Sequence, residues 1–334
     1  MKGEEKMVDL STQYLGMKLK NPIIAGSSGL TDSVKGIEEL EKSGAAAVVL
    51  KSIFEEEIAL EYDDVLKEAS KDGLNLDQFD YYDFHLKGEK LAGYATLIEE
   101  SKRAVSIPII ASINCVYSHE WTSFAKTLQT AGADALELNM FFLPSDFERT
   151  SEEKENAYFQ IIEKIRKEVT IPVALKISHY FSNLGPMIQK LSETGIGGLV
   201  LFNRFYSPDF DIDKMEVIPS NIFSFPSDLS ISLRWIAIMA ERVSCDLAAS
   251  TGVHDGEALI KQLLAGANAV QVASTLYLNG RDRIAEMLKT LEKWMGEKGY
   301  ESLADFRGKM SQAKSRNPSA YERVQFMKYF GGIR

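Results

Sequence analysis

The sequence lacks the features that several classes of protein require. Its two cysteines, Cys115 and Cys245, lie far apart and belong to no CxxC or Cys/His cluster. This argues against a disulfide framework and against a zinc or other metal site, so we interpret both as buried thiols. No run approaches the roughly 18 consecutive apolar residues of a membrane span. The charged segment from Met1 to Leu10 has no apolar signal-peptide core. We therefore expect a cytoplasmic protein without a membrane partner.

Excess positive charge and a Gly-rich nucleotide fingerprint are also missing. The formal net charge of -10 disfavours nucleic acid as a partner, because both surfaces would be negative. No GxGxxG motif occurs, which disfavours an open doubly wound dinucleotide-binding sheet. The 45% of residues that are hydrophobic supply a large core and suit one globular domain over residues 1–334.

Short β-branched runs alternate with amphipathic stretches along the chain, a rhythm that predicts buried parallel strands separated by helices. Helices are expected over Trp121 to Ala131, Ala157 to Val169, Pro186 to Thr194 and Glu257 to Ala265. Eight strand-helix units favour a closed α/β (β/α)8 TIM barrel. The eight expected strands are 22–25, 46–51, 108–112, 135–139, 172–176, 198–203, 246–249 and 269–273.

Two segments interrupt this rhythm, and a tail follows it. The acidic, Tyr-rich stretch from about 54 to 87 and the Pro-containing stretch from about 204 to 230 both follow expected strand ends. Barrel enzymes place active-site lids there, although disordered insertion is the alternative. From about Gly299 onward we expect a closing helix plus an extension.

Polar residues stand where the expected strands end. Active sites of barrels lie at the carboxyl ends of the strands, and core packing does not demand polar groups there. Each is therefore a candidate site residue. The set comprises Lys51 with Ser52, Asn114, Asn139, Lys176, Asn203, and the turn Ser250-Thr251-Gly252.

The two lysines indicate the charge of the ligand. A buried cation is costly unless it is paired, so Lys51 and Lys176 behind apolar runs imply an anionic or electron-accepting guest. A flavin fits, because its reduced ring carries negative charge near N1 and O2 that an ammonium stabilises. Lys176 is our candidate for that role.

Small residues after the last two strands suggest a phosphate site. Thr251-Gly252 and Ala273-Ser274-Thr275 let backbone N–H groups approach a phosphate, and the corresponding loops of barrels often bind one. A helix cap with a tight turn explains Ser-Thr-Gly equally well.

Together these residues resemble the dihydroorotate dehydrogenase family of FMN barrels through nearly the whole chain. Similar stretches are Asn21-Pro22 with Ala25-Gly26-Ser27-Ser28-Gly29, Leu50-Lys51-Ser52, Glu137-Leu138-Asn139, Leu175-Lys176, Val200-Leu201-Phe202-Asn203, Thr251-Gly252-Val253, Gln271-Val272-Ala273-Ser274, and the ending 298–308. The resemblance implies FMN as cofactor, with Asn114, Asn139 and Asn203 near the substrate. The FMN would be lined by Gly26, Ser27, Lys51, Ser52, Asn139, Lys176, Asn203, Thr251, Gly252, Ala273 and Ser274.

The catalytic base of the family has no counterpart here. After Asn139 the family reads Asn-x-Ser-Cys-Pro-Asn, or carries Ser at the base, whereas this chain places Phe142 or Leu143 there, and neither can remove a proton. The family stretch Asn-x-Met-Gly-x-x-Asn is also absent between 54 and 87. Substitute bases are Ser145 with Asp146, His179 and Cys115, which equally suit a helix cap, a loop residue and a core thiol. His179 is the better replacement because its ordinary pKa is nearest neutrality.

We therefore expect an FMN-dependent oxidoreductase acting on a CH–CH bond of dihydroorotate or a related small substrate, in pyrimidine biosynthesis. Lys176, His179 and Ser145 are the catalytic candidates. The resemblance further implies a homodimer, and a redox partner protein stays open. Alternatives are a diverged flavoprotein that shuttles electrons without its own substrate, and a flavin-free phosphate-ligand barrel such as an aldolase with a Schiff base at Lys176.

Overall fold

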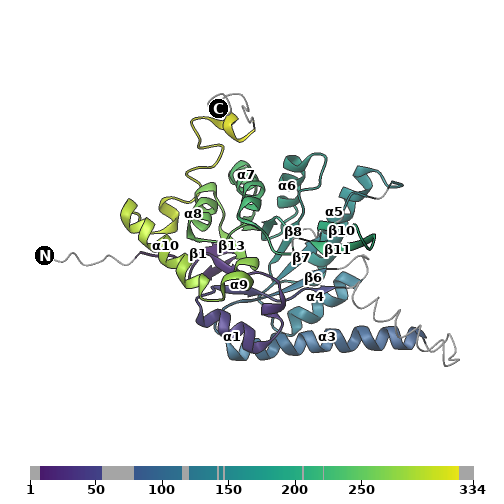
Figure 1. The fold of residues 1–334 in the computed structure, drawn as a ribbon. Coiled ribbons are helices and arrows are strands. Elements are labelled where there is room, and N and C mark those ends of the chain that lie inside the picture. Colours follow the sequence, from purple (N-terminus) through teal and green to yellow (C-terminus); the bar gives the residue numbers. More distant parts are fainter. Residues whose placement is uncertain are drawn as a thin grey trace.

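The computed structural model is an α/β barrel whose helices surround a central parallel sheet (Figure 1). It describes residues 8–54, 79–114, 120–140, 143–145, 147–204, 207–220 and 222–322. Of the helices in these ranges, none is long and apolar enough to cross a membrane.

Within the described residues, eight parallel strands close on themselves through the pairs β4–β6 and β13–β3. A short strand, β5 (Ile53–Phe54), pairs beside them with the end of β6. The predicted (β/α)8 fold is confirmed, and each predicted strand overlaps an observed one. The barrel strands are β3 (Ile23–Ala25), β4 (Ala47–Val49), β6 (Ile109–Asn114), β7 (Ala135–Met140), β8 (Val173–Ile177), β9 (Gly198–Leu201), β12 (Asp246–Ser250) and β13 (Ala269–Val272).

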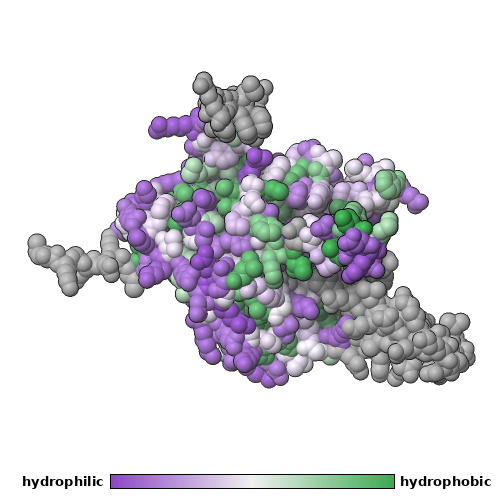
Figure 2. All heavy atoms as spheres, in the orientation of Figure 1, coloured by the Kyte–Doolittle hydropathy of each residue, from purple (hydrophilic) through white to green (hydrophobic). Residues whose placement is uncertain are grey.

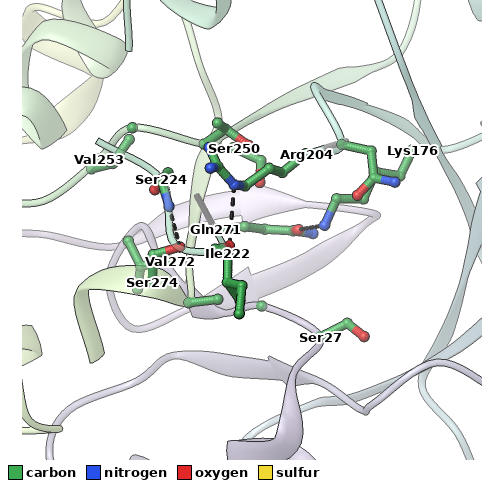
Figure 3. A pocket seen from close by; sticks show the side chains of 15 residues that line it. Ser27, Lys176, Arg204, Ile222, Ser224, Ser250, Val253, Gln271, Val272 and Ser274 are labelled. Carbon is green, nitrogen blue, oxygen red and sulfur yellow. Dashed lines mark hydrogen bonds between the residues drawn. The ribbon is translucent and has the colours of Figure 1, made fainter. Parts of the chain in front are cut away.

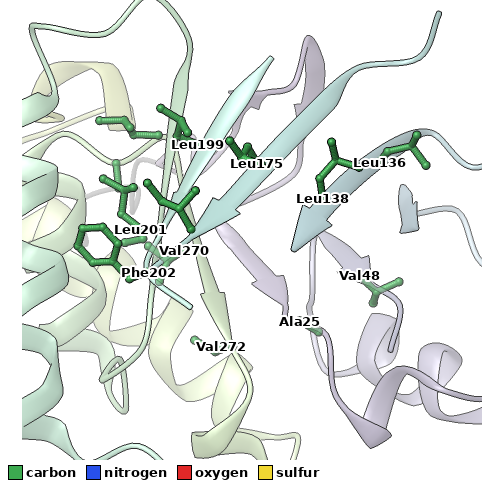
Figure 4. Packing of buried hydrophobic residues seen from close by; sticks show 14 of the residues in the cluster. Ala25, Val48, Leu136, Leu138, Leu175, Leu199, Leu201, Phe202, Val270 and Val272 are labelled. Carbon is green, nitrogen blue, oxygen red and sulfur yellow. The ribbon is translucent and has the colours of Figure 1, made fainter. Parts of the chain in front are cut away.

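A helix follows each barrel strand and packs outside it. The outward-facing side chains of the strands, such as Leu136, Leu175 and Leu199, are buried against these helices (Figure 4). The four helices predicted by residue range are α4, α5, α6 and α8. The helices are α1 (Val34–Lys42), α3 (Phe79–Ala104), α4 (Glu120–Thr130), α5 (Ser151–Glu168), α6 (Leu184–Ser192), α7 (Leu229–Met239), α8 (Gly256–Ala265), α9 (Ser274–Asn279) and α10 (Arg283–Lys298).

Local signals fix where these helices begin and end. At the start of α5 the Thr150 hydroxyl accepts from the Glu153 N–H at 3.2 Å, and the Glu153 carboxylate accepts from the Thr150 N–H at 2.7 Å, a capping box. Helix α8 ends at Gly266, whose φ of 125° favours glycine. A Cβ there would lie 2.4 Å from the Cβ of Ala240. Gly266 therefore ends α8 before β13, as predicted, and it also leaves the space that Ala240 occupies.

A β-hairpin closes the amino-terminal end of the barrel. Strands β1 (Thr12–Tyr14) and β2 (Met17–Leu19) are antiparallel, and Tyr14, Leu15 and Leu19 are buried against the lumen. Asp246 anchors the hairpin by accepting from the Leu15 N–H at 2.8 Å. The lumen side chains that pack with the hairpin are aliphatic, and most are alanine: Ile24, Ala46, Ala47, Val49, Ile110, Ala135, Ala174, Val200, Ala248 and Ala269.

The segment from 204 to 230 contains more structure than the expected loop. Strands β10 (Ser207–Asp211) and β11 (Glu216–Ser220) form an antiparallel hairpin, and a 3-10 turn, η3 (Pro226–Asp228), precedes α7. Prolines hid the strand signal, because proline suits only strand edges where its missing N–H is not needed. Pro208 and Pro219 stand opposite each other in this two-stranded ribbon, which has no central strand.

Two other expectations need correction. The stretch 54–87 is not loop to its end, because α3 begins at Phe79, and residues 55–78 lie outside the described residues. The closing helix expected from Gly299 is absent from the described tail, which forms the short 3-10 turns η4 (Leu303–Asp305) and η5 (Pro318–Tyr321). The helix that closes the barrel, α10, ends before Gly299, whose left-handed φ of 72° stops it.

Candidate active site

A layer of polar side chains lies above the apolar lumen, at the carboxyl ends of the strands. Successive residues of a strand face opposite sides, so Glu137 on β7, Lys176 on β8 and Gln271 on β13 point inward like Ala135, Ala174 and Ala269 one layer below. All three are buried, with exposed fractions of 1% for Glu137, 8% for Lys176 and 2% for Gln271.

These three side chains contact one another. The Lys176 ammonium donates to Oε1 of Gln271 at 2.9 Å and lies 3.6 Å from Oε1 of Glu137. The amide nitrogen of Gln271 donates to the other carboxylate oxygen of Glu137. The amide thus bridges a buried ion pair, and Oε1 of Glu137 has no hydrogen bond in the structure as described.

A cavity of about 330 Å³ opens directly above this layer (Figure 3). Its wall comes from β3, β8, β9, β12, β13 and the segments that follow them. The predicted site residues that it brings together are Gly26, Ser27, Lys176, Asn203, Thr251, Gly252, Ala273 and Ser274.

One side of the cavity is built from small residues in special backbone conformations. Thr251 and Gly252 have φ of 76° and 80°. A Cβ on Gly252 would lie 2.1 Å from the backbone N of Leu229, so only glycine fits. A threonine in the left-handed region is strained, and such strain concentrates at functional sites. The Thr251 hydroxyl donates to the carbonyl of Phe202 at 3.0 Å, which holds this conformation.

The segment after the β10–β11 hairpin crosses the same side of the cavity. The Ser224 N–H donates to the Ser274 hydroxyl at 3.0 Å, and the Ser224 hydroxyl contacts Nε2 of His254 at 3.0 Å. Arg204 donates to the Ile222 carbonyl at 3.2 Å (Figure 3). It also donates to the Asp228 carboxylate at 2.7 Å. Burial lowers the pKa of His254 below its ordinary value, so the ring is neutral at neutral pH.

The lysine at the end of β4 differs from Lys176. Lys51 lies two residues beyond the end of β4, and its side chain is exposed rather than buried as expected. The neighbouring Ser52 is buried, and its hydroxyl contacts Ser27 at 3.1 Å and Ser112 at 2.6 Å. Ser52 therefore supports a residue of the cavity wall. A role for Lys51 in binding a cofactor stays a prediction.

Of the three predicted asparagines, Asn203 lines the cavity, whereas Asn139 and Asn114 are not among its described lining residues. Asn139, two residues after Glu137 on β7, is 7% exposed. Its side-chain amide oxygen, Oδ1, has no hydrogen-bond partner in the structure as described. Asn203 lines the cavity, and its backbone N–H donates to Ile177 at 2.8 Å. Asn114 is the last residue of β6 and is partly buried. A buried acceptor without a partner is costly, so Asn139 suits a ligand that donates an N–H.

The candidate bases have different surroundings. His179 lines a smaller cavity of about 150 Å³ that shares Asn203 and Thr251 with the main one. Its ring stacks on Tyr180 at 4.4 Å, and burial lowers its pKa. Ser145 is exposed in a turn and lines neither of these cavities. Cys115, Phe142 and Asp146 lie outside the described residues.

Sequence reasoning missed Glu137 and Gln271 as members of the site. Both stand in stretches that are similar to the family, Glu137-Leu138-Asn139 and Gln271-Val272-Ala273-Ser274. A signal was present, because Glu137 shares the inward face with Asn139 in a strand that is otherwise apolar. A carboxylate at such a position needs a buried partner.

Comparisons with known proteins agree with this geometry. The family model for dihydroorotate dehydrogenase matches residues 9–295. The chain is 28% identical to the catalytic subunit of dihydroorotate dehydrogenase B (NAD(+)) from Thermoplasma volcanium, over 90% of this chain and 98% of that protein. It is 26% identical to dihydroorotate dehydrogenase A (fumarate) from Lactococcus lactis subsp. cremoris, over 90% of this chain and 99% of that protein. The chain therefore belongs to the dihydroorotate dehydrogenase family.

Proposed function

We propose that this chain is an FMN-dependent oxidoreductase that transfers a hydride between flavin N5 and a CH–CH bond of a small substrate, dihydroorotate or a relative of it. Members of its family are oxidoreductases of this class. The observation that carries the proposal is the buried Lys176 ammonium at the floor of a cavity whose opposite wall contains Gly252 and Ser274. A cation at one end and small residues at the other suit an electron-accepting ring with a phosphate tail.

The residues present fit FMN. Lys176 would face the part of the ring that gains negative charge, and the unpartnered carbonyl of Asn139 would accept from a ring N–H. Gly26, Ser27 and Asn203 would border the cofactor, with Thr251, Gly252, Ala273 and Ser274 around the phosphate. When bound, FMN supplies a hydride acceptor that the chain lacks.

His179 is the base that we propose in place of the usual Cys or Ser. Burial lowers its pKa, so the imidazole is neutral at pH 7 and can accept the substrate proton. The cavity that it lines joins the main one through Asn203, which together with Asn139 and Asn114 would hold the substrate. The exposed Ser145 is the weaker candidate, because a hydroxyl needs an adjacent base to become reactive and Ser145 lines neither of the two cavities.

The absorption spectrum of the purified protein tests the cofactor. We expect flavin bands, or their appearance on binding when FMN is added to stripped protein. Lys176→Met should weaken FMN binding about 10- to 100-fold, since a charge-assisted hydrogen bond contributes about 1.5–3 kcal/mol. Lys190→Met, which removes an exposed lysine of α6, is the matched control and should leave the affinity unchanged. Colourless protein that does not bind added FMN would contradict the proposal.

Anaerobic titration with dihydroorotate tests the substrate. Bleaching of the flavin bands indicates dihydroorotate oxidation, whereas bound FMN that dihydroorotate leaves oxidised indicates a diverged substrate or an electron-transfer role. A Schiff-base aldolase is disfavoured, because Lys176 is ion-paired with Glu137 whereas an amine attacks in its uncharged form. Borohydride trapping with carbonyl compounds should therefore yield no adduct at Lys176.

We also propose that the chain forms a homodimer and accepts a redox partner protein. Some relatives are named catalytic subunits, which is a statement about those proteins. In this chain the hairpin β10–β11 exposes Phe210, Ile212, Met215 and Val217, and hydrophobic side chains gather in this region beside hydrophilic ones (Figure 2). Light scattering during gel filtration measures the oligomeric state directly.

A further inference from the structure

The buried contacts of Lys176 imply a function for Glu137 and Gln271. We propose that Glu137 and Gln271 are positioning residues for Lys176. They set how close the Lys176 ammonium lies to the bound flavin, and they set the net charge of the cluster that the three residues form. This inference rests on the proposed function, because it concerns how the chain holds FMN. Glu137 does not line the cavity and acts through Lys176. Gln271 lines the cavity, and the effect assigned to it here is the one that it has through Lys176.

The lumen below this cluster is apolar. One layer below, the same strands fill the barrel with Ala135, Ala174 and Ala269. A buried ion pair at the next layer carries a desolvation penalty, and apolar replacements of similar volume are often as stable or more so. Packing alone therefore does not explain a carboxylate with 1% exposure at position 137. A need for charge close to a ligand in the cavity does explain why a carboxylate is buried at this position.

The charge around Glu137 is balanced by one cation in the described residues. Among the residues that the structure describes, Glu137 forms one ion pair, with Lys176 at 3.6 Å. Tyr14, from the hairpin below, and Tyr94 also interact with the Glu137 charge, but burial chiefly raises the pKa of both phenols, so they stay neutral. The cluster thus has a net charge near zero, and its field on the cavity depends on where the ammonium sits.

Gln271 determines that position. Its carbonyl oxygen accepts from Lys176 at 2.9 Å, while its amide nitrogen donates to Glu137. With Gln271 bridging, the ammonium remains 3.6 Å from the nearest carboxylate oxygen instead of closing to the 2.7–2.9 Å of a direct charged hydrogen bond. One carboxylate oxygen, Oε1, is left without a hydrogen bond. Removal of the amide should let the ammonium move down toward Glu137 and away from the cavity.

Two substitutions then have opposite effects. Glu137→Gln leaves the Lys176 charge uncompensated, so the protein should favour the negatively charged reduced FMN more strongly. Gln271→Met keeps both charges but lets the ammonium move toward Glu137 and away from the cavity. The preference for reduced FMN should therefore weaken. A unit charge in a partly desolvated site changes such a preference by about tenfold or more. If the two residues served packing alone, the two substitutions would not change the preference for reduced FMN in opposite directions.

The experiment measures dissociation constants of oxidised FMN and of chemically reduced FMN for stripped protein under anaerobic conditions. We expect the ratio of the oxidised to the reduced constant to rise about tenfold or more in Glu137→Gln and to fall in Gln271→Met. Glu163→Gln, the same chemical change at an exposed glutamate of α5, should leave the ratio unchanged. Circular dichroism and thermal unfolding report whether each variant is folded.

Unchanged ratios in both variants, or shifts in the same direction, would overturn the inference. If Glu137→Gln does not fold, Gln271→Met decides, since it alters no charge: a lower ratio supports the inference and an unchanged or higher ratio refutes it. Wild-type protein that binds FMN with unaltered ratios in the variants refutes only this inference. Wild-type protein that binds no FMN refutes the proposed function and this inference together.

Discussion

The two ends of the barrel lumen are filled in different ways. At the amino-terminal end Tyr14, Leu15 and Leu19 pack against small apolar side chains, and the hairpin β1–β2 closes the barrel. At the carboxyl end Glu137, Lys176 and Gln271 form a charged layer beneath an open cavity. The same eight strands build both ends, so the difference lies in which residues face inward and in the hairpin that covers one end. One end is therefore packed as stability requires, and the other has the cavity and the charges that ligand binding requires.

The largest difference between the two ends is expected for a substitution of His179, which should lower activity without lowering stability. His179→Gln should lower turnover of the substrate about 10²- to 10⁴-fold, the range that a general base contributes, with FMN affinity and thermal stability close to wild type. Steady-state and single-turnover reduction of the flavin measure the effect. A variant with wild-type turnover would remove His179 from the mechanism and leave the base among the remaining candidates.

The closed end should show the reverse pattern. Leu19→Ala should lower the free energy of unfolding by about 2–5 kcal/mol, because it leaves a cavity in the sealed lumen. The FMN dissociation constant of the folded variant should change by less than about twofold. Substitutions at distant sites that share no partners have independent effects, and Leu19 lies at the opposite end of the barrel from the cavity. Urea unfolding and FMN titration provide the two readouts.

Leu278→Ala is the matched control for that change, because Leu278 is 55% exposed on α9. It should alter stability by less than about 0.5 kcal/mol. If Leu19→Ala abolished FMN binding while remaining folded, the separation between the two ends would fail.

The smallest effect concerns pH and links the mouth to stability. Burial lowers the pKa of His254 in the folded state, so between that pKa and the ordinary value near 6.5 the unfolded chain binds more protons. Stability should therefore be fully present above about pH 6.5 and fall as the pH is lowered toward the folded pKa. One such proton contributes a slope of at most about 1.4 kcal/mol per pH unit.

His254→Gln should reduce this slope, measured by unfolding at several pH values between about 5 and 7.5. Glutamine can still contact the Ser224 hydroxyl, which His254 reaches at 3.0 Å. The pKa of His179 is lowered by burial as well, so part of the slope should remain. An identical slope in the variant and the wild type would show that His254 does not titrate in this range.

Much of the fold could be predicted because its signals are local. Alternating apolar runs and amphipathic stretches identified the eight strands, and glycines such as Gly266 marked helix ends through their backbone freedom. The hairpin β10–β11 was missed because its stability depends on pairing between two proline-containing segments rather than on either segment alone. The short turns after Gly299 were mistaken for a helix for a similar reason, since Phe306 is held by Trp294 and Tyr300 and not by helix propensity.

The site was predictable in part, because strand ends are visible in the sequence and barrels place their chemistry there. This reasoning identified Lys176, Asn203 and Gly252, which line one cavity. It did not distinguish Lys51, which is exposed, from Lys176, which is buried, since both follow apolar runs. Nor did it identify Ser224, which reaches Ser274 across 50 residues.

The sequence by itself determined the strand-helix alternation, the inward face of each strand and the kinds of polar residue at the mouth, because these depend on neighbours a few positions apart. Only the tertiary structure decided which of those residues meet. Glu137, Lys176 and Gln271 come from three strands that are far apart in the chain, and closure of the barrel brings them into one buried network. Their charges can coexist there because the closed sheet excludes water and holds each partner in place.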